Sequence, residues 1–345
     1  MATNKVTTNV IDMSGNTGGL VWAQGTKAQR PAGVAGDLRL NTDDSRLEFY
    51  NGTDWKRLSE TAGTPSVDFQ ADFLVVAGGG SGGADSNSGG GGAGGLRTSY
   101  GSTSGGGALA ESSLNMYFST NYTVTVGAGG ADTPNTNPYI GNDGSDSVFS
   151  TITSIGGGGG VGQFGTPNGR PGGSGGGGAY DASQQGGSGT ANQGFDGGGG
   201  AGVVGNISGG GGGGASEAGN TDAQGYGGDG LAVSITGSSV FYAGGGGAGA
   251  NSGSGPANPG GDGGGGQGQC TPNNNTAGSA NTGGGGGGYA GGGTVGKAGG
   301  SGVVIIRYPN TVTISVGAGL TSTTTTDGSD KVTTFTAGSD TVSFS

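Results

Sequence analysis

Apolar and polar residues alternate in two short runs near the start of the chain, at residues 38–41 and 46–50. Alternation with a period of two is typical of a β-strand that buries one face. The residues between the runs, 41–45, are turn formers, and an Asn-Gly pair at Asn51 leads into a third run that reaches Trp55. The pattern predicts a β-hairpin followed by a third strand. A unit this small needs a partner surface or an oligomer for stability.

Through the middle of the chain, short runs of β-forming residues lead directly into blocks of glycine. These runs lie at residues 73–77, 122–126, 149–155 and 240–243, and the glycine-rich zone closes with a further run at 302–308. A flexible linker has no reason to contain buried-strand patterns. We therefore expect an ordered arrangement in which short strands edge the glycine blocks.

The last part of the chain changes to Thr, Val, Ser and Phe with few glycines. Residues 312–316, 332–336 and 341–344 are predicted to be strands at an edge or cap, a position that also allows them to be shared between subunits. The chain is thus divided into an N-terminal β module for mounting or oligomerisation (1–65), a glycine-rich domain (66–308) and a C-terminal Thr/Val-rich β segment (309–345). The predicted fold class is mainly β and irregular.

Glycine content decides what the central domain can be. The chain has 345 residues, of which 96 are Gly and 10 are Pro. Collagen requires Gly at every third position and abundant Pro, whereas here Gly is clumped, as at 209–214 and 283–288. Glycine is also unfavourable in helices and ordinary strands. One alternative is a left-handed helix with three residues per turn, provided that neighbouring rods pair their main-chain groups laterally.

Rods of this kind are joined by turns that lie outside the packed region and can carry any sequence. The larger interruptions of the glycine pattern lie at residues 132–146, 163–171, 179–196, 251–259 and 267–282. Loops on a rigid scaffold are where recognition usually resides. The alternative is a disordered, elastomer-like linker, in which the glycine blocks make no mutual contacts.

Charge and residue chemistry argue against nucleic-acid binding and catalysis. The net charge is −11, whereas phosphate binding needs clustered Lys and Arg. The chain has no His and a single cysteine, Cys270. A glycan-cleaving enzyme needs two fixed carboxylates, but Asp181, Asp196 and Asp222 are followed by or close to small, flexible residues. We expect no enzymatic activity, no cofactor and no metal site.

Residues 141–149 are close to one calcium-binding nonapeptide repeat, with Asn142 in place of Gly. Such repeats bind calcium between successive turns, so a single copy lacks half of the ligands. We interpret the segment as an Asp/Gly turn that enters a strand.

The N-terminus lacks a secretory signal, and no apolar stretch is long enough to span a membrane. We therefore expect no membrane insertion. An extracellular role then implies release by assembly into a particle followed by lysis.

Several segments resemble phage proteins. Residues 25–31, 36–42 and 47–55 resemble a module that recurs in phage tail-fibre and virion proteins. The block from Phe73 to Tyr308 is similar to glycine-rich fibre proteins of marine and cyanobacterial phages, and to the long-tail-fibre adhesins of T-even-like phages. This resemblance implies a central polyglycine II helix bundle edged by short strands, whose distal loops contact a bacterial receptor.

Single aromatic residues in the interruptions are the candidate receptor contacts, together with Arg170, the only Arg between positions 98 and 306. The aromatic candidates are Tyr139, Phe164, Tyr180, Phe195 and Tyr226. They either anchor the loops onto the bundle or stack on sugar rings and pack against an outer-membrane protein.

The resulting expectation is a non-enzymatic virion fibre or adhesin, extracellular and homotrimeric. Its partners would be a bacterial surface protein or glycan and other virion proteins. The alternative is a structural fibre or decoration protein that binds no receptor.

Overall fold

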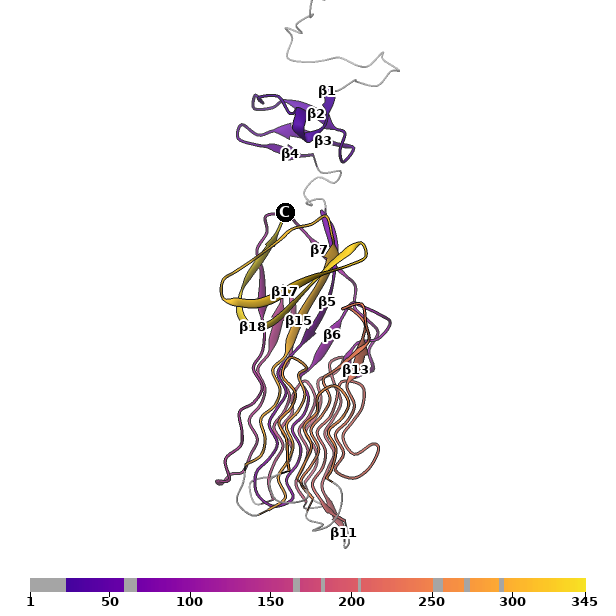
Figure 1. Cartoon of the computed structure of the whole chain (residues 1–345), viewed down its shortest axis with the longest axis vertical. Coiled ribbons are helices and arrows are strands. Elements are labelled where there is room, and N and C mark those ends of the chain that lie inside the picture. Colours follow the sequence, from indigo (N-terminus) through magenta and orange to yellow (C-terminus); the bar gives the residue numbers. More distant parts are fainter. Residues whose placement is uncertain are drawn as a thin grey trace, which may run out of the picture. The chain divides into compact units, whose positions relative to one another are not determined.

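The computed structural model describes residues 23–58, 67–163, 168–180, 184–203, 206–250, 257–269, 274–291 and 295–345. The chain divides into two compact units, 1–66 and 67–345. Among the described residues there is no α-helix, and the two 3₁₀ turns, η1 (Lys27–Gln29) and η2 (Gly105–Gly107), are short. The fold is mainly β, as predicted (Figure 1).

The first unit is a four-stranded sheet in the order β1 (Ala23–Gly25), β2 (Leu38–Asn41), β3 (Arg46–Tyr50) and β4 (Trp55–Arg57). Strand β1 is parallel to β2, and the other pairs are antiparallel. The predicted hairpin and third strand are thereby confirmed.

An ion-pair network occupies the interior of this small sheet. The carboxylate of Glu48 is buried, with 1% of the side chain exposed, and accepts hydrogen bonds from Arg30 Nη2 at 2.6 Å and Arg39 Nη1 at 2.9 Å. The Arg39 guanidinium in turn lies 5.8 Å from the centre of the Trp55 ring. Burial by itself raises the pKa of Glu48, but the hydrogen bond from Arg30 and the two positive charges outweigh burial, so the pKa is below its ordinary value.

The second unit contains a ten-stranded antiparallel sheet that is nearly closed into a barrel. Its main path runs β10-β9-β8-β18-β15-β5-β6, with β16 and β17 paired to β18 and β7 paired to β5. These strands are β5 (Phe69–Val76), β6 (Leu96–Thr98), β7 (Leu114–Met116), β8 (Tyr122–Thr125), β9 (Ser147–Phe149), β10 (Ile152–Ser154), β15 (Val303–Pro309), β16 (Ile314–Val316), β17 (Leu320–Asp327) and β18 (Asp330–Phe344). Two separate hairpins pair β11 (Ala201–Val203) with β12 (Asn206–Ser208), and β13 (Leu231–Val233) with β14 (Val240–Tyr242).

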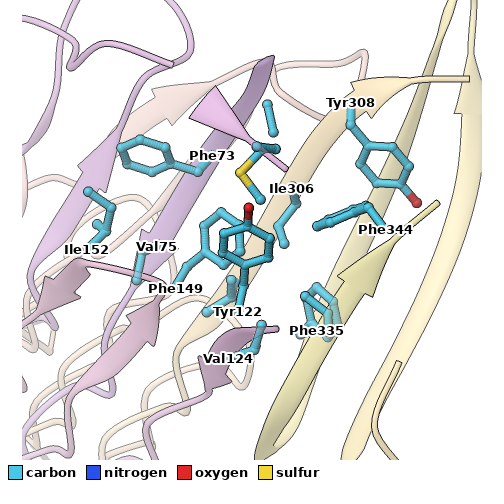
Figure 2. Packing of buried hydrophobic residues seen from close by; sticks show 14 of the residues in the cluster. Phe73, Val75, Tyr122, Val124, Phe149, Ile152, Ile306, Tyr308, Phe335 and Phe344 are labelled. Carbon is cyan, nitrogen blue, oxygen red and sulfur yellow. The ribbon is translucent and has the colours of Figure 1, made fainter. Parts of the chain in front are cut away.

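The two apolar runs that bound the glycine-rich region, β5 and β15, pair with each other at the centre of this sheet. Val75 lies opposite Val304, and Phe73 opposite Ile306. Their side chains on one face join a core that includes Phe149, Phe335 and Phe344 (Figure 2). The residues between them, such as Leu74 and Ile305, are buried in a second core on the other face. Burial on both faces explains why these runs are continuously apolar and do not alternate.

Two details differ from the sequence prediction. The run at 149–155 is not one strand, because the chain turns at Ser150 (φ 54°) between β9 and β10. The C-terminal residues form strands, but β18 is not at an edge. It pairs with β15 through its first half and with β8 through its second half, so it lies inside the sheet.

The glycine tracts leave the sheet and run alongside one another (Figure 1). In residues 78–83, three consecutive main-chain N–H groups donate to three different neighbouring segments. The next three N–H groups donate to the same segments in the same order, so each segment recurs at every third residue. The donors and acceptors, at 2.8–3.0 Å, are Gly78 to Ser145, Gly79 to Gly300, Gly80 to Gly92, Ser81 to Asn142, Gly82 to Lys297 and Gly83 to Gly89. This tract is therefore bonded on three sides.

The same period holds in residues 89–95, where Gly89, Gly92 and Gly95 donate to Val161, Gly158 and Ile155. The tracts pack so closely that a side chain does not fit. A Cβ on Gly91 would collide with the carbonyl oxygen of Gly80. The described tracts are thus ordered by lateral main-chain bonds, contrary to a linker whose glycines make no contacts.

Candidate functional site

The end of the glycine tracts farthest from the large sheet is defined by the path of the chain. The chain leaves β5 at Val76, reverses at residues 84–87 and returns to β6 at Leu96. Asp85 (φ 69°) and Asn87 (φ 48°) take left-handed backbone conformations in this reversal. We call this end of the tracts the distal end. Figure 1 shows β11 at the same end.

Two of the predicted aromatic residues lie at the distal end. The carbonyl of Tyr139 accepts the N–H of Ala84 at 3.3 Å and the N–H of Gly162 at 3.1 Å. The N–H of Tyr180 donates to the carbonyl of Asn87 at 3.0 Å. Both side chains are half-buried. Their main chains are therefore fixed to the ends of the tracts while part of each ring is exposed.

Tyr139 and Arg170 line one pocket of about 400 Å³. The other lining residues come from the adjoining loop and the segment that follows it. They are Thr133, Pro134, Thr136, Pro138, Ile140, Gly141, Asn142 and Asp143. The structure thus joins two residues that are well separated in sequence into one recess, lined by a ring, prolines, hydroxyls and an amide.

An ion pair forms one wall of this pocket. Arg170 Nε donates to Asp143 Oδ1 at 2.6 Å, and Arg170 Nη2 donates to Asp143 Oδ2. The hydrogen bond that the guanidinium donates to Asp143 raises the pKa of Arg170. The same Asp143 Oδ1 accepts the N–H of Gly159 at 2.9 Å, and the N–H of Arg170 donates to the carbonyl of Gly159 at 3.0 Å. Both charged residues are therefore anchored to one glycine tract.

Asp143 has a role that sequence reasoning missed. Its segment enters strand β9, as predicted, but its carboxylates also replace main-chain acceptors for a neighbouring tract. Asp143 accepts from Gly159, and Asp146 accepts from Gly156 at 2.8 Å. The signal available in the sequence was the spacing of the two aspartates, which equals the three-residue period of the tracts.

The remaining candidates are not part of this pocket. Phe195 lies near the large sheet, since Gln193, two residues earlier, accepts the N–H of Leu96 at the start of β6. Tyr226 is half-buried and accepts the N–H of Asn220 in a separate turn. Phe164 lies outside the described residues. The interruption at 179–196 therefore contains reversals at both ends of the tracts.

A second pocket, of about 570 Å³, lies at the sheet end near Gln193. It contains the ion pair between Arg97 and Glu111 (2.6 Å) and the apolar side chain of Leu109, which is 82% exposed. Gln193 Oε1 accepts the N–H of Ile155, and Arg97 donates to Glu111. The polar groups of this pocket therefore connect structural elements.

The carboxylates considered for catalysis are dispersed or used in turns. Asp196 accepts the N–H of Gly189, and Asp181 lies outside the described residues. Asp222 can bring an oxygen within 4.8 Å of oxygens from Glu217 and Asp229. In this group Glu217 accepts the N–H of Asp229, a contact between two segments twelve residues apart. Cys270 is likewise outside the described residues.

The part of the chain that the structure describes holds no helix long and apolar enough to cross a membrane. Comparison with the curated proteins gave no match. A family model described as a glycine-rich domain matches residues 59–309, which is most of the chain and includes the β5 strand, the tracts, the pocket and β15. The chain therefore belongs to the glycine-rich domain family.

Proposed function

We propose that the glycine tracts form a polyglycine II bundle. A threefold helix directs successive N–H groups at intervals of about 120°, so each residue meets a different neighbour. The recurrence of one neighbouring segment at every third residue of 78–83 supports this assignment. The steric limit at Gly91 also supports it, because only glycine permits main chains to approach so closely.

On this scaffold, the protein acts as a non-enzymatic fibre or adhesin of an extracellular phage particle, and its distal loops recognise a bacterial surface. The observation that carries the proposal is the pocket of Tyr139 and Arg170 at the distal end. A recess with a few polar groups and an aromatic ring is what a binding site requires. Its loop is tied to the tracts through Tyr139, so less ordering is needed on binding.

The pocket chemistry suits an outer-membrane protein or a glycan. The Tyr139 ring offers a face for a sugar or an apolar side chain. Asn142, Thr133 and the ion pair of Arg170 with Asp143 offer donors and acceptors to hydroxyl groups. The net charge of the pair is zero, so the recess does not select for an acidic ligand by charge alone.

Binding of the purified full chain to cells of candidate host bacteria tests this proposal. We expect binding that falls at least about tenfold in the variant Tyr139→Ala, as for loss of a central aromatic contact. Cells treated with protease lose a protein receptor, and cells oxidised with periodate lose a glycan receptor. The matched control is Phe241→Ala, an aromatic that is 46% exposed on β14, near the sheet end.

If the native protein binds none of the candidate host bacteria, the attachment function is contradicted. That result would favour the structural fibre or decoration protein, for which the loops only face solvent. Equal binding by native protein and Tyr139→Ala would retain attachment but remove this pocket as its site.

A further inference from the structure

One long strand of the large sheet has an unpaired side. Strand β17 pairs with β18 along its full length, from Leu320 opposite Gly338 to Asp327 opposite Asp330. No other described strand pairs with it. Five of its eight residues are exposed, namely Thr321 and residues 323–326. The hairpin of β17 and β18 is the yellow element in Figure 1.

The turn of this hairpin fixes which main-chain groups face outward. Two residues, Gly328 and Ser329, connect the strands, and Gly328 has a positive φ of 60°. In a two-residue hairpin the residues that flank the turn, here Asp327 and Asp330, exchange both of their main-chain hydrogen bonds. Alternation along the strand then directs the N–H and C=O groups of Ser322, Thr324 and Thr326 away from β18.

This edge lacks the features that normally prevent strands from pairing with another chain. Exposed edges are usually protected by proline, by lysine or by a bulge at their centre. Residues 320–326 of β17 contain only Leu, Thr and Ser. The one register shift falls between Thr321 and Ser322, at one end of the outward-facing set. Thr, a β-branched residue, favours the extended conformation.

We propose that β17 binds β17 of a second copy of this chain, as an antiparallel pair centred on Thr324. In that register Ser322 of each copy lies opposite Thr326 of the other, so the outward-facing residues meet only one another. Asp327 lies opposite Thr321, and no two carboxylates face each other. The strand is therefore complementary to itself in both hydrogen bonding and charge.

The pairing joins the sheets of two chains and brings two distal pockets into one assembly. Two sites on one particle raise the effective affinity for a surface that carries many copies of a ligand. The pairing itself rests only on the edge strand and stands whether or not the pocket binds a receptor.

Molecular mass in solution, measured by light scattering over a concentration series of the full chain, tests the pairing. The native chain is expected to reach the mass of two copies. Thr324→Pro removes the central outward N–H of each copy without removing a bond to β18, and is expected to shift dimerisation to at least about tenfold higher concentration. Thr324→Val also loses the hydroxyl contact to Thr333 but keeps the N–H, so it should dimerise as the native chain does.

A second readout keeps the test independent of folding defects in the proline variant. Deuterium uptake by a peptide spanning β17 in the native chain should slow as concentration rises into the dimer range. The double variant Ser322→Lys with Thr326→Lys places like charges opposite each other and should stay monomeric. A native mass of one or three chains at every concentration, or a dimer with unchanged uptake in β17, would overturn the proposal.

Discussion

The guanidinium of Arg170 and the carboxylate of Asp143 form a two-point ion pair, with Nε and Oδ1 2.6 Å apart. Arg170, the only Arg between positions 98 and 306, was predicted from the sequence to be a candidate receptor contact. Its charge is balanced within the pocket wall, and both partners are bonded to Gly159. Recognition through this wall would depend on fixed hydrogen-bond geometry more than on net charge.

Removing this pair should affect attachment more than stability. The side chains of Arg170 and Asp143 are 46% and 36% exposed, and pairs at such exposure contribute about 0.2–1 kcal/mol. We expect Arg170→Gln to change the free energy of unfolding by less than about 1 kcal/mol, measured by denaturant titration. Cell binding should fall at least about tenfold. A loss of stability with unchanged binding would show that the pair is only structural.

Close packing of the tracts predicts a large cost for a single methyl group. The variant Gly91→Ala should destabilise the second unit by more than about 3 kcal/mol, because the surrounding acceptors are main-chain atoms that cannot rotate away. The control is Gly199→Ala, where the nearest atom to a Cβ, the carbonyl oxygen of Gln184, is 3.3 Å away. Thermal unfolding followed by circular dichroism compares the two. Similar melting temperatures for both variants would contradict lateral close packing.

Phe344, close to the end of the chain, is predicted to be essential to the large sheet. Its ring lies 5.1 Å from Phe69 and 5.4 Å from Tyr308, measured between ring centres, and 2% of the residue is exposed (Figure 2). Phe344→Ala should lower the free energy of unfolding by about 3–5 kcal/mol. Phe241→Ala, at an exposed position, should change it by less than about 0.5 kcal/mol. Equal effects of the two substitutions would place Phe344 outside the core.

The first unit should lose stability in acid. Since the pKa of Glu48 is lower in the folded state than its ordinary value of 4.5, its contribution is fully present above that value. The contribution is lost as the pH falls through the folded-state pKa. Trp55 lies in β4 of this unit, and the second unit contains no tryptophan, so tryptophan fluorescence follows the first unit without a signal from the second.

A matched variant isolates the Glu48 carboxylate. Glu48→Gln should destabilise the unit by about 3–5 kcal/mol at neutral pH, because Arg39 stays buried without a charged partner. The loss of stability as the pH falls below 4.5 should shrink in the same variant. An unchanged acid transition monitored by tryptophan fluorescence would assign it to other groups.

Local patterns in the sequence were sufficient to predict several elements. The hairpin of β2 and β3 follows from alternation on both sides of a polar turn, which are properties of neighbouring residues. The apolar runs of β5 and β15 also identified strands. Their pairing with each other could not be predicted, because register across the whole glycine-rich region is set by tertiary contacts. The interior position of β18 was missed for the same reason: alternation indicates a strand but not its partners.

The candidate pocket was predictable only in part. Loops between glycine tracts were predicted to be the place for recognition, and Tyr139 and Arg170 were named individually. Which loops share an end depends on the direction and length of each tract, so Phe195 was grouped with residues from the opposite end. Asp143 was interpreted only as a turn residue. Its further role could not be predicted, because it accepts hydrogen bonds from Gly159 and Arg170, which are distant from it in the sequence.

Hydrogen exchange of the glycine amides is the most direct test of the laterally bonded bundle. Mass spectrometry of deuterium uptake can follow peptides that cover residues 78–83 and 89–95 in the native chain. The bonds from these residues to Ser145, Gly300, Gly92 and their equivalents predict protection comparable to that of β5 and β15. Exchange of these glycines at the rate of an unfolded peptide, while β5 and β15 stay protected, would contradict the account.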